Sequence, residues 1–479
     1  MSRFGDRLAR AFHPRVVAVV GDKKGNDFLW LRALRQFDGT LYSVQIDAAE
    51  IPAIEALGVV NVPSLLAIPE EVDYVVVAVP RSVVPRVLAD CARKAVGAVT
   101  LFTAGFSEIG DAEGRRLEAD VAAIAEQAGL LVIGPNCMGI TNPSLGLCNF
   151  PGQPAGSAAA GHVAFLGQSG THTISLCVRG PAEGVGIGKA VSFGNGIVAD
   201  AADFLDYFRT DPDTRVIAAY IEGVRNGRRF YDVLRQTTQA KPVLLWKGGL
   251  TAAGERAIFS HTAALATPAA VWRGMVRQAG ALPVDSQDDL LDAARALLAA
   301  PPVAGRRAGL IAMTGGPSVA ITDAFMEAGL EVPLLSDASY ERLAAFFQVV
   351  GGSFRNPLDA GSTIAMGFRA DNLARLLDVL EGDPSIDLLA IDLGATLSIE
   401  RWLDHPQLFE ALATGLAVFA DRSAKPLAVI LDAPHRPVES AHFRQTLARR
   451  GLLTFHSAVR AARALLAVST YHRWRAGLD

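Results

Sequence analysis

The sequence predicts an α/β protein with parallel sheets, and three observations support this fold class. Short apolar runs typical of buried strands alternate with amphipathic segments typical of helices along nearly the whole chain. The runs are continuously apolar, which suits strands that helices cover on both faces. The chain has 479 residues, enough for about three domains, and two linker-like stretches divide it in that way.

The first unit, residues 1–150, opens with a strand and a basic turn. Strands are expected at residues 16–20, 41–46, 74–79, 98–102 and 130–133, with helices at 85–96 and 114–128. Gly21, Lys23 and Lys24 follow the first strand, where a dinucleotide-binding fold carries its glycine-rich turn, but the GxGxxG spacing is missing. The two lysines can pair with a ligand's phosphates or form a solvated turn, and both interpretations stay open.

The second and third units open in the same way. Residues 151–160, rich in Pro, Gly and Ala, lead into the second unit, residues 151–303, with strands expected at 162–166, 216–221 and 242–246. Residues 299–305 form a second linker before the third unit, residues 304–479, with strands expected at 308–313, 387–393, 427–431 and 452–455. Each unit begins with an apolar strand, a Gly/Ser turn and a helix, so we interpret the two units as distant structural repeats.

Both opening turns are candidate phosphate sites. Free backbone N–H groups and the positive end of the helix dipole attract anions at a helix N-terminus. Ser169 is expected to cap the first helix, and Gly315 and Gly316 are expected to allow unusual backbone angles at the second. The alternative is an ordinary turn between strand and helix. The candidate phosphate-binding residues are Gln168, Ser169, Gly170, Gly315, Gly316 and Ser318.

His261 is the candidate nucleophile. It lies between Ser260 and Thr262 in a run of small residues, which favours an accessible ring over a packed one. Imidazole is largely unprotonated near neutral pH and can attack an electrophile. The alternative is that Ser260 or Thr262 merely begins a helix.

The composition excludes several classes of protein. The net charge is −4, with 45 basic and 49 acidic residues intermixed, so no nucleic-acid groove is expected. The apolar runs are too short to span a membrane and the start lacks an apolar signal core, so we expect a soluble, cytoplasmic protein. Four cysteines without CxxC spacing indicate buried thiols in a reducing compartment, with no metal site.

Taken together, these segments resemble the α subunit of the NDP-forming acyl-CoA synthetases, which include the ADP-forming acetate–CoA ligases of the succinyl-CoA ligase superfamily. Residues 134–140 are similar to the family's Gly-Pro-Asn-Cys-Leu-Gly segment. Residues 168–170, 191–195, 220–223, 260–262 and 314–317 resemble further family segments in the same order. The resemblance covers nearly the whole chain.

The resemblance implies a Rossmann-like CoA-binding domain followed by two flavodoxin-like parallel-sheet domains. It implies that acyl-CoA, ADP and phosphate are interconverted with a carboxylic acid, CoA and ATP through an acyl phosphate and a phosphohistidine. His261 would carry the phosphoryl group, and Glu222 would accept the other ring N–H of the histidine. Phe193 and Asn195 would line the acyl pocket. The implied CoA-binding residues are Gly21, Lys23, Lys24, Pro80, Ser82, Thr103, Gly105, Phe106 and Asn136.

The same resemblance implies a partner. We expect ADP or ATP and Mg to bind a separate ATP-grasp β subunit in a hetero-oligomer, because no ATP-grasp segment is found in the sequence. The family usually reads Ser-His-Thr-Gly-Ala at the histidine, whereas this chain has Ala263 after Thr262. This departure favours one alternative, a CoA-binding regulatory or scaffold protein without phosphohistidine turnover. The other alternative is an NAD(P)-binding oxidoreductase, against which the missing GxGxxG spacing argues.

Overall fold

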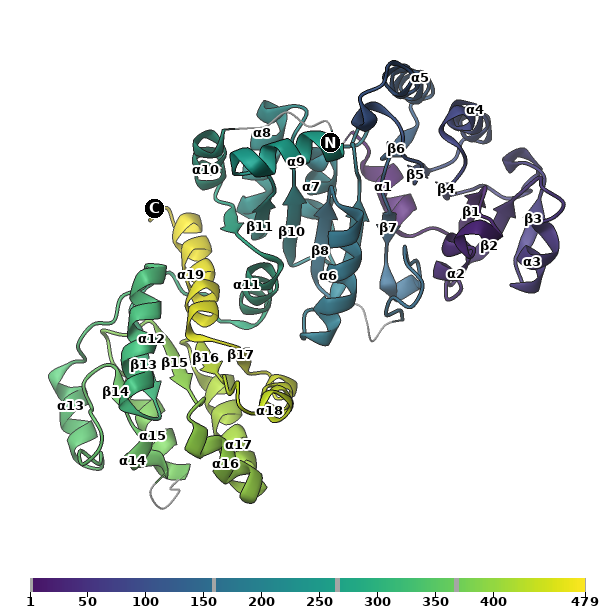
Figure 1. Cartoon of the computed structure of the whole chain (residues 1–479). Coiled ribbons are helices and arrows are strands. Elements are labelled where there is room, and N and C mark those ends of the chain that lie inside the picture. The colour runs from purple at the N-terminus through teal and green to yellow at the C-terminus, as the bar shows by residue number, and fades with distance from the viewer. Residues whose placement is uncertain (1–2, 157–160, 263–267, 366–369, 479) are drawn as a thin grey trace. The chain divides into compact units, whose positions relative to one another are not determined.

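The computed structural model describes residues 3–156, 161–262, 268–365 and 370–478 (Figure 1). The chain forms two compact units, residues 1–290 and 291–479. The predicted α/β class with parallel sheets is confirmed. The domain boundaries expected after residues 150 and 303 stay predictions.

The first sheet has the strand order β3-β2-β1-β4-β5-β6, and all its strands are parallel. This is the order of a Rossmann fold, whose ligand crevice lies at the carboxyl edge of the strands. The strands are β1 (Val16–Val20), β2 (Thr40–Val44), β3 (Val60–Val62), β4 (Tyr74–Val77), β5 (Ala98–Leu101) and β6 (Leu131–Ile133). The α-helices before and between them are α1 (Gly5–Phe12), α2 (Leu29–Ala33), α3 (Ile51–Ala56), α4 (Val84–Lys94) and α5 (Ala112–Ala128). The 3-10 turns are η1 (Lys24–Asn26), η2 (Leu65–Ala67), η3 (Arg81–Val83), η4 (Ser107–Ile109) and η5 (Pro143–Leu145).

The second sheet has the order β12-β11-β10-β8-β9-β7. β7 pairs antiparallel with β9, although it precedes the linker at residues 151–160, and the other five strands are parallel in a flavodoxin-like order. The strands are β7 (Gly139–Thr141), β8 (Val163–Gly167), β9 (Ile187–Ser192), β10 (Val216–Ile221), β11 (Val243–Lys247) and β12 (Leu282–Val284). The helices are α6 (Gly170–Ala182), α7 (Ala201–Thr210), α8 (Gly227–Ala240), α9 (Ala252–Thr262), α10 (Ala269–Gln278) and α11 (Gln287–Ala299).

The third sheet repeats the flavodoxin-like order as β14-β13-β15-β16-β17, all parallel. Its strands are β13 (Ala308–Ala312), β14 (Leu358–Asp359), β15 (Leu388–Asp392), β16 (Leu427–Ile430) and β17 (Leu453–Phe455). Its helices are α12 (Gly315–Ala328), α13 (Asp337–Ala344), α14 (Gly361–Ala365), α15 (Ala370–Glu381), α16 (Thr396–Asp404), α17 (Pro406–Arg422), α18 (Pro437–Arg449) and α19 (Ala458–Arg475). The expected repeat of the two flavodoxin-like sheets is confirmed.

The cores follow from the apolar strands. Every residue of β1, β4, β5, β8, β10 and β13 is buried, as expected for strands with helices on both faces. All four cysteines are buried free thiols. Within the described ranges, none of the helices is both long and apolar enough to span a bilayer.

Candidate functional site

The predicted CoA-binding residues gather at the carboxyl edge of the first sheet. Gly21 follows β1, and the exposed Lys23 and Lys24 lie in the next turn. Pro80 and Ser82 follow β4; Thr103, Gly105 and Phe106 follow β5; and Asn136 follows β6. The structure therefore brings them to the edge where open α/β sheets bind ligands.

Side chains on both sides hold the loop after β5. The Glu108 carboxylate accepts hydrogen bonds from the backbone N–H of Gly105 (2.6 Å) and of Phe106 (3.1 Å). Arg81 donates to the Gly105 carbonyl (2.7 Å), and the Thr103 hydroxyl donates to the Val79 carbonyl (2.7 Å). Phe106 is buried in the core of the first sheet. These hydrogen bonds hold the loop to its neighbours on both sides.

The turn at Asn136 is joined to the loop after β9. The Asn195 N–H donates to the Pro135 carbonyl (3.1 Å). Gly194 has φ +49°, and a Cβ on it would lie 2.2 Å from the Pro135 oxygen, so only glycine fits this close approach. Phe193 is buried against Phe204. The residues predicted for the acyl pocket therefore meet the end of the CoA-binding sheet.

The start of α6 is bonded to the turn that carries Glu222. Ser169 caps the helix as predicted, because its Oγ accepts a hydrogen bond from the His172 N–H (3.3 Å). The neighbouring Gln168 accepts hydrogen bonds at Oε1 from the N–H of Glu222 (2.5 Å) and of Gly223 (2.9 Å). Sequence reasoning assigned these residues to one site, and the structure places them side by side.

Gly170, the third residue of this turn, faces protein rather than open space. A Cβ on Gly170 would lie 2.8 Å from Cγ of Met138. The Met138 N–H donates in turn to the Ser192 hydroxyl (3.1 Å). Glycine at this position lets the segment after β6 pack against the helix start.

Glu222 lies in a buried polar cluster at the end of β10. Its exposed fraction is 3%. The Tyr220 hydroxyl is hydrogen-bonded to the Glu222 side chain, and burial together with this acid raises the pKa of Tyr220 well above its usual range. Lys247 donates to the Glu222 carbonyl (2.8 Å), and burial lowers the pKa of the Lys247 ammonium group. The His172 ring lies 4.6 Å from the Tyr220 ring, centroid to centroid.

The helix that carries His261 begins beside this cluster. The Gly248 N–H donates to the Ile221 carbonyl (3.0 Å), and α9 starts four residues later, at Ala252. α9 contacts η4, the turn that contains Glu108. The side chain of His261 and residue Ala263 lie outside the described residues. The alternative that Ser260 or Thr262 begins a helix is wrong, because both belong to the end of α9.

The second predicted phosphate turn lies at the start of α12. Gly315 and Gly316 are the first residues of the helix, and neither has a positive φ, so the unusual backbone angles that glycine allows are not adopted there. The capping residue Thr314 makes no side-chain capping bond. Ser318 is buried and its hydroxyl donates to the Gly315 carbonyl (2.7 Å). The hydroxyl is therefore already engaged within the helix.

Comparison with known proteins identifies the family. Residues 15–143 match a CoA-binding domain, and residues 160–297 match the succinyl-CoA ligase like flavodoxin domain. The α subunit of acetate–CoA ligase (ADP-forming) II from Pyrococcus furiosus is 33% identical over 382 residues, which are 79% of this chain and 80% of that protein. The chain belongs to the ADP-forming acetate–CoA ligase family. The resemblance drawn from the sequence motifs is confirmed.

Other members of the acetate–CoA ligase family match as well. Acetate–CoA ligase (ADP-forming) I from Archaeoglobus fulgidus is 34% identical over 82% of this chain, and the match covers 56% of that longer protein. The solved structure of a dinucleotide-forming acetyl-coenzyme A synthetase 1 from Ca. Korarchaeum cryptofilum, in complex with phosphate and ADP, has a TM-score of 0.84. It is 29% identical and covers 98% of both chains. Family membership argues against the NAD(P)-binding oxidoreductase alternative.

Sequence reasoning missed four residues that contact the predicted site residues: Glu108, His172, Tyr220 and Lys247. Glu108 and Lys247 contact residues distant in the sequence, namely Asn195 and Glu222. Lys247 closes the last strand before α9, and a charged residue at the end of an apolar strand is the one signal that singles it out.

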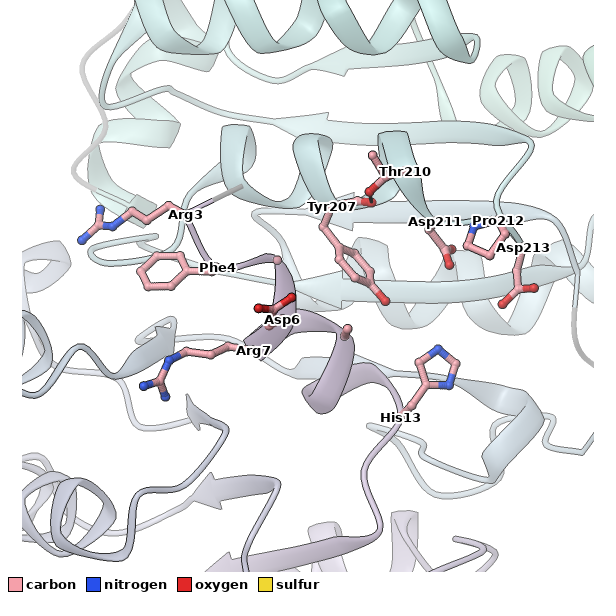
Figure 2. Close-up of a pocket in the computed structure, with 12 residues that line it drawn as sticks. Arg3, Phe4, Asp6, Arg7, His13, Tyr207, Thr210, Asp211, Pro212 and Asp213 are labelled. Atoms are coloured by element: carbon pink, nitrogen blue, oxygen red, sulfur yellow. Dashed lines mark hydrogen bonds between the residues drawn. The ribbon is translucent and has the colours of Figure 1, made fainter. Parts of the chain in front are cut away.

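A separate cavity of about 680 Å³ contains none of the predicted site residues. Figure 2 shows Tyr207 and His13 at its wall, from α7 and from the end of α1. The loop with Asp211 and Asp213 forms another side, and both acids pair with the buried Lys189. Burial and the charge of Lys189 lower the pKa of His13.

Proposed function

We propose that this chain is the α-type subunit of an NDP-forming acyl-CoA synthetase. Such an enzyme interconverts acyl-CoA, ADP and phosphate with a carboxylic acid, CoA and ATP. The single observation that supports this best is the junction at Gln168, which joins the capped start of α6 to the buried Glu222. The helix with His261, α9, begins at the same edge of the second sheet.

The proposed reaction has three group transfers. Phosphate attacks the thioester carbonyl, the C–S bond breaks, and the CoA thiolate takes a proton, which leaves an acyl phosphate. A ring nitrogen of His261 then attacks phosphorus, and the P–O bond to the acyl group breaks to release the carboxylate. ADP finally takes the phosphoryl group from His261 to give ATP. Splitting the transfer in this way lets two distant sites share one phosphoryl group.

The residues around the histidine have different roles in this proposal. Glu222 accepts the second ring N–H of His261, which fixes the tautomer and stabilises the positive charge that develops on the ring. The N–H groups at the start of α6 stabilise the phosphoryl oxygens. The start of α12 is the second candidate for that task.

The proposal includes partners. CoA and a carboxylic acid bind this chain, with Lys23 or Lys24 near the CoA phosphates, and a separate ATP-grasp β subunit holds ADP or ATP with Mg. The name of the Pyrococcus furiosus relative, a subunit alpha, supports a hetero-oligomer. Buried free thiols support a cytoplasmic location.

ATP formation tests the proposal directly. We expect acyl-CoA, ADP and phosphate to yield ATP when an ATP-grasp partner is added to the full chain, and to yield none with the chain alone. Omission of either acyl-CoA or phosphate is the control for the complete mixture. ATP synthesis at the same rate with and without the partner would contradict the proposed division of labour.

A further inference from the structure

Glu108 joins two parts of the site that come from different sheets. One carboxylate oxygen accepts from the Gly105 N–H (2.6 Å), and both oxygens are 3.1 Å from the Phe106 nitrogen. The second oxygen also accepts from Nδ2 of Asn195 (2.8 Å). Gly105 and Phe106 belong to the loop after β5, whereas Asn195 belongs to the loop after β9. One side chain therefore connects the predicted CoA loop to the predicted acyl pocket.

The Asn195 amide is oriented by this carboxylate. An ionised carboxylate only accepts hydrogen bonds, so the NH2 group of Asn195 must face it. The exposed fraction of Asn195 is 9%, and its Oδ1 is buried with no hydrogen-bond partner among the residues described. Buried polar atoms are rarely left unpaired in native proteins, and each exception calls for an explanation. The Asn195 amide therefore directs its NH2 group to Glu108, although this orientation leaves Oδ1 without a hydrogen-bond partner among the described residues.

The loop that Glu108 holds is also fixed from its other side. Arg81 donates to the Gly105 carbonyl (2.7 Å) and is itself paired with Asp111 (3.2 Å) and Glu113 (2.7 Å). The turn that contains Glu108 contacts α9, the helix with His261. The turn with Glu108 therefore contacts three parts of the predicted site: the loop after β5, the loop after β9 with Asn195, and α9.

We propose that Glu108 is a positioning residue that sets the CoA loop and Asn195 relative to each other. This inference rests on the proposed function, since it takes CoA and the acyl group to bind at these loops. In acyl transfer the phosphate must approach the face of the thioester carbonyl, and small displacements of reacting groups slow such reactions strongly. The Glu108–Asn195 bond keeps the loop after β5 and the loop after β9 at a fixed distance from each other.

Two single variants and their combination test the bond. Asn195→Asp sets two carboxylates against each other, and we expect CoA affinity and kcat/KM for CoA to fall roughly tenfold or more. Glu108→Gln is expected to cost less, because Asn195 can turn its amide and accept from the new NH2 group. In the double variant the amide introduced by Glu108→Gln donates to the carboxylate introduced by Asn195→Asp, so both quantities should return to within about threefold of wild type.

The readouts separate positioning from folding. CoA affinity is measured by calorimetry on the full chain, kcat/KM with the ATP-grasp partner, and the unfolding temperature on every variant. The control is Glu126→Gln on the exposed surface of α5, which should change none of them. The inference is overturned if the double variant is no better than Asn195→Asp, or if Asn195→Asp lowers only the unfolding temperature.

The same data distinguish this inference from the proposed function. If the wild-type chain with its partner makes no ATP, but CoA affinity follows the expected order of variants, the proposed function fails and the positioning role in CoA binding stands. If the wild-type enzyme makes ATP and CoA affinity is the same in all variants, the positioning role fails and the proposed function stands.

Discussion

The helices α6 and α12 begin with similar sequences but in different surroundings. Ser169 caps α6, and Gln168 connects that start to the buried Glu222. At α12, Thr314 makes no side-chain capping bond. A carboxylate oxygen of Asp359 lies 3.3 Å from where a Cβ on Gly315 would be. The same strand–turn–helix pattern therefore occurs once with a bonded polar network and once beside an acid.

The two helix starts differ in how well each can bind an anion such as phosphate. At α12, one oxygen of Asp359 is buried without a partner among the described residues, and burial raises the pKa of this carboxyl group. A helix N-terminus stabilises negative charge, so an ionised Asp359 competes with phosphate for it. The turn sequence specifies the helix start, whereas residues from neighbouring strands decide which chemistry it supports.

The largest expected effect in this comparison belongs to Glu222. Glu222→Gln keeps the size of the side chain but removes the negative charge that supports the developing imidazolium. Loss of one such partner costs roughly 10²–10³ in kcat. Rates of ATP formation by the complete enzyme measure it, and Glu327→Gln on the exposed surface of α12 is the matched control. A Glu222→Gln rate within a factor of two of the wild-type rate would remove Glu222 from the mechanism.

The capping difference between the two helices should appear in local stability. Ser169→Ala removes a side-chain capping bond, which costs about 1 kcal/mol and hence makes amide exchange roughly fivefold faster in the first turn of α6. Thr314→Ala removes no such bond, so exchange in the first turn of α12 should change less than twofold. Hydrogen exchange read by mass spectrometry measures both. Equal effects would show that the two helix starts do not differ in this respect.

The smallest effect concerns Asp359. Because its folded-state pKa is raised, the folded state binds this proton more tightly than the unfolded state, so the stability it contributes is full at low pH and is lost as pH rises through the raised pKa. Asp359→Asn should therefore raise the unfolding temperature near pH 7 by roughly 2 °C and leave it unchanged at pH 3. Calorimetric scans at the two pH values check this. A lower unfolding temperature at pH 7 would mean that the ionised carboxylate is stabilising.

The sequence predicted most of the longer strands, because they carry enough apolar residues to show a pattern, but it missed the six-residue β9, in which Gly188 and Lys189 interrupt the apolar run. The strand at residues 216–221 has the predicted limits, and Ser169 caps α6 as expected. The two-residue β14 and the three-residue β3, β7 and β12 were also not predicted, whereas the three-residue β6 and β17 lie in apolar runs and were expected. The crossing of β7 into the second sheet depends on tertiary pairing that the sequence of residues 139–141 does not reveal.

Site residues could be predicted when they lie in a family motif. They could not be predicted when only a contact with a residue distant in the sequence connects them to the site. Glu222 and Gln168 were assigned to one site through family motifs, and the structure places them together. Glu108 went unnoticed because its partner Asn195 is 87 positions away and neither residue type is unusual in a loop. Gly315 and Gly316 could adopt unusual backbone angles but begin α12 without a positive φ, since glycine permits a positive φ without requiring it.

Phosphate labelling of His261 tests the central claim most directly. The full chain and an ATP-grasp partner are incubated with ATP labelled on the γ-phosphate, and the protein is then treated with acid or base. The account predicts a label on the wild-type chain that is labile in acid and stable in base, as for a phosphoramidate, and no label or turnover in His261→Ala, with CoA binding retained. Wild-type turnover by His261→Ala would contradict the phosphohistidine mechanism and favour a CoA-binding regulatory or scaffold role.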